Sequence, residues 1–160
     1  MWGLHCKLYT KRIDIGGISM AITGPALRQL RSHRSIHEGA YAEARDITDV
    51  TDRLFYDDRK EDCLKAANAL VEYWETRVIA HADTEDEGFY KELLEKRPEI
   101  TKEVHMLSRD HDLFRKIVGN IKEQLEEKKM VTKEIVNQFH ALLVIKEIHN
   151  KGEEDNLFTE

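Results

Sequence analysis

Four stretches of this chain repeat apolar or histidine positions at alternating steps of three and four residues, and this spacing strongly constrains the fold. Residues at this spacing lie on one face of an α-helix, so each stretch predicts an amphipathic helix that packs along a seam. The predicted helices run from about 25 into the low fifties, from about 59 to 94, from 101 to about 125 and from 132 to about 153. No stretch signals a strand. The sequence therefore predicts an all-α fold.

The links between the predicted helices are short, which favours antiparallel neighbours. We therefore expect an antiparallel up-down-up-down four-helix bundle. Thr23 can cap the first helix and Pro25 suits its first turn. These two positions divide the chain into an expected N-terminal extension over residues 1–22 and a bundle domain over residues 23–160.

Composition excludes several classes of function. The chain has 25 Lys and Arg against 31 Asp and Glu, a net charge of -6 and no basic stripe, which argues against binding of nucleic acid. No apolar run reaches the ~18 to 20 residues that cross a membrane. Cys6 and Cys63 lie far apart and form no Cys-x-x-Cys motif, so a reduced, cytoplasmic compartment is expected.

A histidine followed four residues later by a glutamate occurs near the ends of two predicted helices. The two copies are His81 with Glu85 and His149 with Glu153. Residues four apart share a helix face, so the imidazole and the carboxylate can reach one point. A single such pair is more often a surface ion pair. Two copies on facing helices favour a metal site.

Two further histidines complete this pattern. His37 and His111 lie early in the first and third helices, whereas His81 and His149 lie late in the second and fourth. In an antiparallel bundle these positions fall at one level along the axis. The candidate metal ligands are therefore His37, His81, Glu85, His111, His149 and Glu153.

The other histidines are weaker candidates. His33 lies one turn before His37 on the same seam, and it could replace His37 or supplement it. His105 is expected at a helix start or on the surface. His140 lies nine residues before His149, some ~13 Å along the axis, too far to bind the same centre.

Four imidazoles and two carboxylates can hold two metal ions, with Glu85 and Glu153 bridging them. The carboxylates offset the charge of two buried cations, which neutral histidines cannot do. Six ligands on two metals leave open positions for a small molecule. This ligand set points to iron, with manganese or zinc as alternative occupants.

The series His37, His81-x-x-x-Glu85, His111 and His149-x-x-x-Glu153 resembles the hemerythrin-like family, also called the HHE cation-binding domain. The resemblance covers roughly residues 25–158 and implies a four-helix bundle with two iron ions in a non-haem di-iron centre. Oxygen-carrying members have a second histidine one turn from the position of His111, where this chain has Leu107 and Arg115. The chain is more similar to members with four histidines and two glutamates.

Those members include iron-centre repair proteins of nitrosative stress and eukaryotic iron or oxygen sensors. The resemblance therefore implies a protein that binds iron and a small diatomic ligand, O2 or NO, in sensing, storage or stress response. The alternative is a di-iron redox enzyme that acts on peroxide, O2 or NO. The repair proteins carry a cysteine-bearing N-terminal segment, and here only Cys6 lies in that part of the chain. A metal-free bundle with functional surfaces is the third interpretation.

Overall fold

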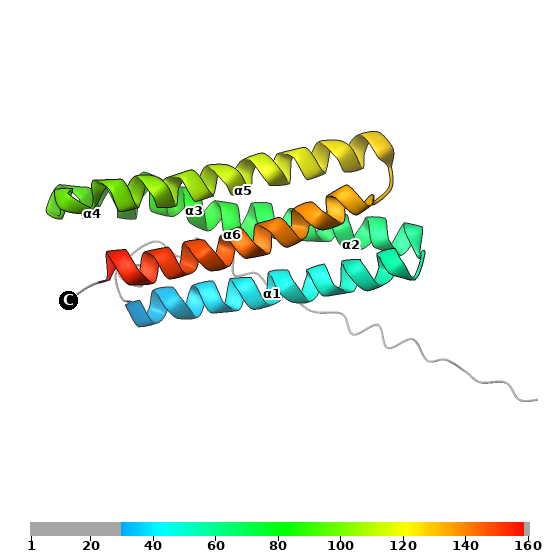
Figure 1. The fold of residues 1–160 in the computed structure, drawn as a ribbon, viewed down its shortest axis with the longest axis horizontal. Helices are drawn as coiled ribbons and strands as arrows, with labels where there is room; N and C mark the ends of the chain where they lie inside the picture. Colours follow the sequence, from blue (N-terminus) through cyan, green and yellow to red (C-terminus); the bar gives the residue numbers. More distant parts are fainter. Residues whose placement is uncertain (1–29, 159–160) are drawn as a thin grey trace, which may run out of the picture.

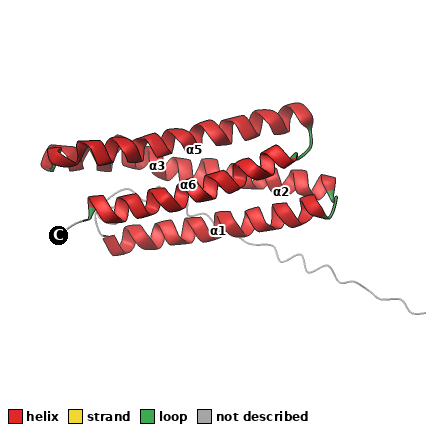
Figure 2. Cartoon of the chain, in the orientation of Figure 1, coloured by secondary structure: helices red, strands yellow, loops and turns green. Residues whose placement is uncertain are grey.

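The computed structural model describes residues 30–158 and shows four helical rods packed side by side (Figure 1). The expected extension over 1–22 and the predicted helix start at Pro25 lie outside the described residues. Within the described part of the chain every regular element is helical, as Figure 2 shows. The first rod is α1 (Leu30–Tyr56), and the last two are α5 (Thr101–Lys128) and α6 (Lys133–Leu157).

The second rod consists of five consecutive segments instead of the single helix that the sequence predicts. They are α2 (Lys60–Tyr73), the π-helix η2 (Trp74–Ile79), α3 (Ala80–Thr84), the π-helix η3 (Glu85–Phe89) and α4 (Tyr90–Lys96). In each π-helix a backbone N–H reaches a carbonyl five residues back, from Ala80 to Glu75 and from Tyr90 to Glu85. The wider turn of a π-helix changes which side chains after it face the interior. The spacing of apolar residues at steps of three and four in the sequence does not reveal this change.

Consecutive rods run antiparallel, and α1 packs against both α2 and α6 while α5 packs against α2 and α6. The predicted up-down-up-down bundle is therefore confirmed. The α1–α2 turn contains Asp58, and Lys129 directly follows the end of α5; both residues adopt positive φ. Thr132 caps α6 by accepting a hydrogen bond from the Ile135 N–H, and the short helix η4 (Pro98–Ile100) joins α4 to α5.

Two apolar clusters fill the bundle and leave a polar layer between them. The larger cluster contains Trp74, Phe114 and Leu142, and the smaller contains Val104 and Leu107. Buried histidine and glutamate side chains form this layer, and every rod contributes at least one of them. Burying a large apolar side chain stabilises a fold by roughly 1.5–3 kcal/mol. The apolar clusters therefore supply the packing that holds the polar layer in place.

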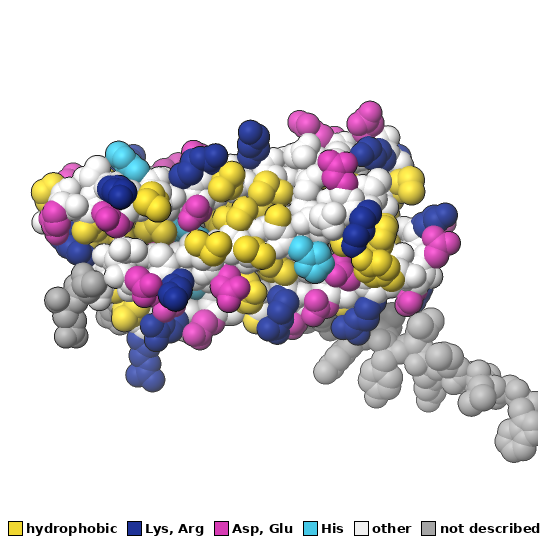
Figure 3. Space-filling model, in the orientation of Figure 1, with side chains coloured by type: hydrophobic (Ala, Val, Ile, Leu, Met, Phe, Trp, Pro, Cys, Tyr) yellow, Lys and Arg dark blue, Asp and Glu magenta, His cyan; other side chains and the backbone are white. Residues whose placement is uncertain are grey.

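The outer face over α5 and α6 carries hydrophobic side chains along its middle and charges of both signs at its edges (Figure 3). Met106 on α5 and Val144 and Ile148 on α6 are exposed. Lysine, arginine, aspartate and glutamate alternate along the edges, so this face carries no basic stripe. Among the described helices, none combines the length and apolar character that a membrane crossing requires.

Candidate metal centre

All four rods contribute side chains to the polar layer. The structure brings together the six predicted ligands: His37 from α1, His81 from α3, Glu85 from the start of η3, His111 from α5, and His149 and Glu153 from α6. Five of them are at most 1 % exposed, and the His81 side chain is 12 % exposed. This is the common level that antiparallel packing demands.

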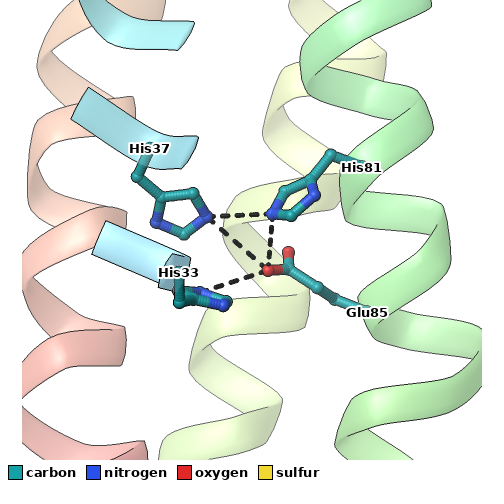
Figure 4. Close-up of side chains that lie close together, drawn as sticks. All are labelled: His33, His37, His81 and Glu85. Carbon is teal, nitrogen blue, oxygen red and sulfur yellow. Dashed lines mark hydrogen bonds and ion pairs between the residues drawn. The ribbon is translucent and has the colours of Figure 1, made fainter. Parts of the chain in front are cut away.

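The first group of ligand atoms joins α1 to the second rod. His33, His37, His81 and Glu85 each place one ligand atom within 4.8 Å of the others (Figure 4). His37 Nε2 lies 3.0 Å from His81 Nε2, and His81 Nε2 lies 2.9 Å from Glu85 Oε1. Two nitrogens that bind one ion at about 2.1 Å with an angle near 90° lie about 3.0 Å apart. The spacing of these atoms therefore fits a single metal ion.

The second group joins the second rod to α5 and α6. It consists of Glu85, His111 and His149, again with ligand atoms within 4.8 Å of one another. His111 Nε2 lies 3.2 Å from His149 Nε2 and 3.3 Å from Glu85 Oε2. Glu85 thus turns Oε1 toward the first group and Oε2 toward the second. Two His/Glu clusters that share Glu85 are suited to a dinuclear metal site.

Glu153 also lies between the two groups, but through one oxygen. Its Oε2 is 2.9 Å from His33 Nε2 and 3.5 Å from His149 Nε2. Its Oε1 accepts a hydrogen bond from the Tyr90 hydroxyl. The two glutamates therefore differ in the number of oxygens that face the candidate metal positions.

Both glutamates are buried, and their neighbours favour the ionised form. Burial favours the neutral acid, yet the nearby imidazoles of His111, His37 and His81 hold the pKa of Glu85 well below its ordinary value. Burial and the charge of Glu85 act in the same way on Glu153, and His149 with its neighbours outweighs them to lower its pKa. Two charged carboxylates in the same buried layer favour the binding of cations there.

The imidazoles respond to their individual surroundings. Burial lowers the pKa of His111, but Asp86 and Glu85 outweigh it and raise that pKa to about 9. Burial also opposes the charging of His33, and its hydrogen bond to Glu153 raises its pKa. For His37, burial together with the charge of Lys146 lowers the pKa to about 3. Metal ions that bind these histidines must therefore displace protons from some of them.

The structure also places the histidines that the sequence left open. His33 is buried and lies beside His37, with ring centroids 4.2 Å apart, so both side chains of this helix turn face the first group. His105 is exposed, as predicted. His140 is exposed as well and binds Asp52 at 2.6 Å, away from the polar layer.

An acidic side chain lies close to the Nδ1 atom of each of two imidazoles. Asp86 Oδ2 lies 3.0 Å from His111 Nδ1, and Asp110 Oδ2 lies 3.6 Å from His149 Nδ1. Asp86 also accepts hydrogen bonds from Ser108 and Arg115. Partners of this kind orient metal-binding imidazoles and set which nitrogen faces the metal.

Sequence reasoning missed two residues of the polar layer, Tyr90 and Lys146. Tyr90 is 2 % exposed and contacts Glu153 and His111. Lys146 is 3 % exposed and lies one turn before His149 on the same face of α6. The spacing of Lys146 from His149 was a usable signal, because a lysine on an apolar seam is rarely buried without a charged neighbour. Tyr90 gave no such signal.

A comparison with family models matches residues 27–160 to the model described as the hemerythrin HHE cation binding domain. Among curated proteins and among solved structures, none matches the chain. The matched span covers all four rods and every side chain of the polar layer.

Proposed function

We propose that this chain, which belongs to the hemerythrin HHE cation-binding family, is a non-haem di-iron protein that binds a small diatomic ligand, O2 or NO. The proposal includes His37, His81, Glu85, His111, His149 and Glu153 as ligands and adds His33. The biological setting that we propose is sensing, storage or stress response. One observation carries the proposal: Glu85 presents a different oxygen to each of the two ligand groups.

The residues present fit two iron ions. Five imidazoles and two ionised carboxylates supply nitrogen and oxygen donors that suit iron, with manganese and zinc as alternative occupants. Iron bound there would supply open coordination positions and reversible electron transfer to a small ligand. Within the chain, Asp86 and Asp110 lie next to two of the imidazoles, and Glu85 and Glu153 would offset the metal charge.

The burial of the site supports a small ligand. Only His81 among the proposed ligands has noticeable exposure, at 12 % of its side chain. Phe89 and Phe158 stack with ring centroids 5.9 Å apart, and Phe158 lies 4.9 Å from the ring of His33. The exposed part of His81 is therefore the side from which a small ligand would reach the proposed centre, because the other proposed ligands are covered by packed side chains.

Metal analysis with anaerobic spectroscopy tests this function. Purified protein should hold about two iron ions for each chain, and addition of O2 or NO should produce a charge-transfer band that disappears when the gas is removed. His81→Ala and His149→Ala should each lose most of the ion that the substituted histidine binds. The surface variant His140→Ala should keep both ions. Full metal occupancy in both ligand variants would overturn the site. Rapid oxidation without a reversible band would favour a redox enzyme that acts on peroxide, O2 or NO.

A further inference from the structure

Tyr90 contacts proposed ligands from two different helices. Its hydroxyl donates a hydrogen bond to Glu153 Oε1 on α6. Its ring stacks on the His111 imidazole of α5, with centroids 5.6 Å apart and planes 7° from parallel. The side chain is 2 % exposed, so water does not compete for either contact. Tyr90 therefore lies against the proposed centre without being one of its ligands.

The π-helix η3 explains how Tyr90 reaches this position. In an α-helix five residues advance by about 500°, which would turn Tyr90 roughly 140° away from Glu85. In η3 the Tyr90 N–H instead bonds to the Glu85 carbonyl, five residues back. The wider turn places the two side chains on the same side of the rod. Local π-helical geometry thus directs a phenol at the interior next to a bridging carboxylate.

The hydrogen bond divides the two oxygens of Glu153 between two tasks. Oε1 is engaged by the phenol, and Oε2 faces His33 and His149. Neither oxygen of Glu85 has a hydrogen-bond partner among the described residues. A hydrogen bond to an ionised carboxylate is stronger and geometrically stricter than one between neutral groups. It restricts rotation of the Glu153 carboxylate and keeps Oε1 away from the metal positions.

From these contacts we infer that Tyr90 is a positioning residue that limits Glu153 to one metal-facing oxygen, while Glu85 offers one oxygen to each ion. The inference rests on the proposed dinuclear site and extends it. The two glutamates occupy equivalent places in the two sequence motifs, yet Tyr90 makes them chemically different. The result is an asymmetric centre in which the coordination positions not taken by Glu153 Oε1 remain open to an added ligand.

Cobalt substitution tests this role without an activity assay, because the visible absorption of Co²⁺ depends on its coordination number. The variant is Tyr90→Phe, which removes the hydroxyl and keeps the ring on His111. The matched control is Tyr73→Phe, since the Tyr73 hydroxyl donates a 3.2 Å hydrogen bond to the Ala40 carbonyl on α1, away from the ligands. Wild type and both variants should bind two Co²⁺ ions.

The expected result separates the variants in spectrum and in affinity. Tyr90→Phe should change the intensity of the cobalt bands, because Glu153 gains a free second oxygen, and should weaken Co²⁺ binding about tenfold through the loss of an orienting partner. Tyr73→Phe should match wild type in both. The inference is wrong if Tyr90→Phe matches wild type in spectrum and affinity while Tyr90→Leu does not. In that case the aromatic ring contributes packing, and the hydroxyl does not position Glu153.

Failure of the site and failure of the inference give different results. A wild-type protein that binds no Co²⁺ overturns the dinuclear site together with the role of Tyr90, whereas normal binding with unchanged spectra overturns the role alone. If Tyr90→Phe does not fold, incorporation of 3-fluorotyrosine, which makes the phenol more acidic with little change in shape, provides the second measurement. It should shift the cobalt bands in wild type and in Tyr73→Phe equally, and absence of a shift contradicts the inference.

Discussion

Asp86 Oδ2 lies 3.0 Å from Nδ1 of His111, so a carboxylate outside the ligand set contacts an imidazole inside it. This contact gives a first prediction. Asp86→Ala should weaken metal binding about tenfold, because the His111 imidazole loses this contact and must be ordered when the ion binds. Asp83→Ala is the matched control, since Asp83 accepts from the same Arg115 side chain without reaching a ligand. Titration with a competing chelator measures both, and equal affinities would contradict the role of Asp86.

Glu85 should be the residue on which both ions depend. Because its two oxygens face different ligand groups, Glu85→Ala should reduce the metal content from two ions to less than one for each chain. Glu87→Ala changes a carboxylate two residues away that is exposed, and it should keep both ions. Metal analysis after desalting checks the prediction. Two retained ions in Glu85→Ala would show that the groups do not share a ligand.

Lys146 places a buried positive charge beside the proposed metal positions. Burial lowers its pKa more than Glu85 and Glu153 raise it, so the charged form is costly in the fold. Lys146→Met should therefore leave the metal-free protein at least as stable as wild type, since replacing a buried charge by an apolar side chain is often neutral or stabilising. It should also strengthen metal binding about tenfold, equivalent to about 1.4 kcal/mol, through the loss of charge repulsion.

The same lysine gives the metal-free protein a pH dependence. Its pKa is lower in the folded state than the ordinary 10.5, so the unfolded chain binds more protons between these two values. The free-energy cost of burying the charged lysine is fully present below its pKa in the folded state. This cost disappears as the pH rises from that folded-state pKa to the ordinary value of 10.5. Stability of wild type relative to Lys146→Met should therefore increase toward alkaline pH in denaturant titrations. A constant difference across that range would indicate that folding does not change the pKa of Lys146.

Gly152 lies inside the second motif, and its lack of a side chain has a packing reason. A Cβ at this position would lie 3.2 Å from Leu107 Cδ2, whereas a Cβ at Gly119 would meet nothing within 4 Å. Gly119→Ala should stabilise the fold by about 1 kcal/mol through helix propensity. Gly152→Ala should gain less or lose stability, because Leu107 must shift. Thermal unfolding of both variants tests this, and equal gains would show that α6 and α5 are not tightly packed there.

The sequence by itself determined the four-helix bundle and the level of its histidines. Helical periodicity specifies which face of each segment is buried, and short links specify antiparallel neighbours. These two properties were enough to predict that His37, His81, His111 and His149 lie in one layer. They also predicted that Glu85 and Glu153, each one turn after a histidine of this layer, lie close to it. The family match over residues 27–160 confirms the resemblance that these residues carried.

Only the tertiary structure decided which neighbours complete the site. His33 and His37 share one seam, and packing alone shows that both face the first group. Tyr90 enters through a π-helical turn, whose backbone hydrogen bonds depend on contacts with the other rods and leave no spacing signal in the chain. The unequal roles of Glu85 and Glu153 follow from that turn, because equivalent positions in a sequence motif become different once a third side chain from another rod binds one of them.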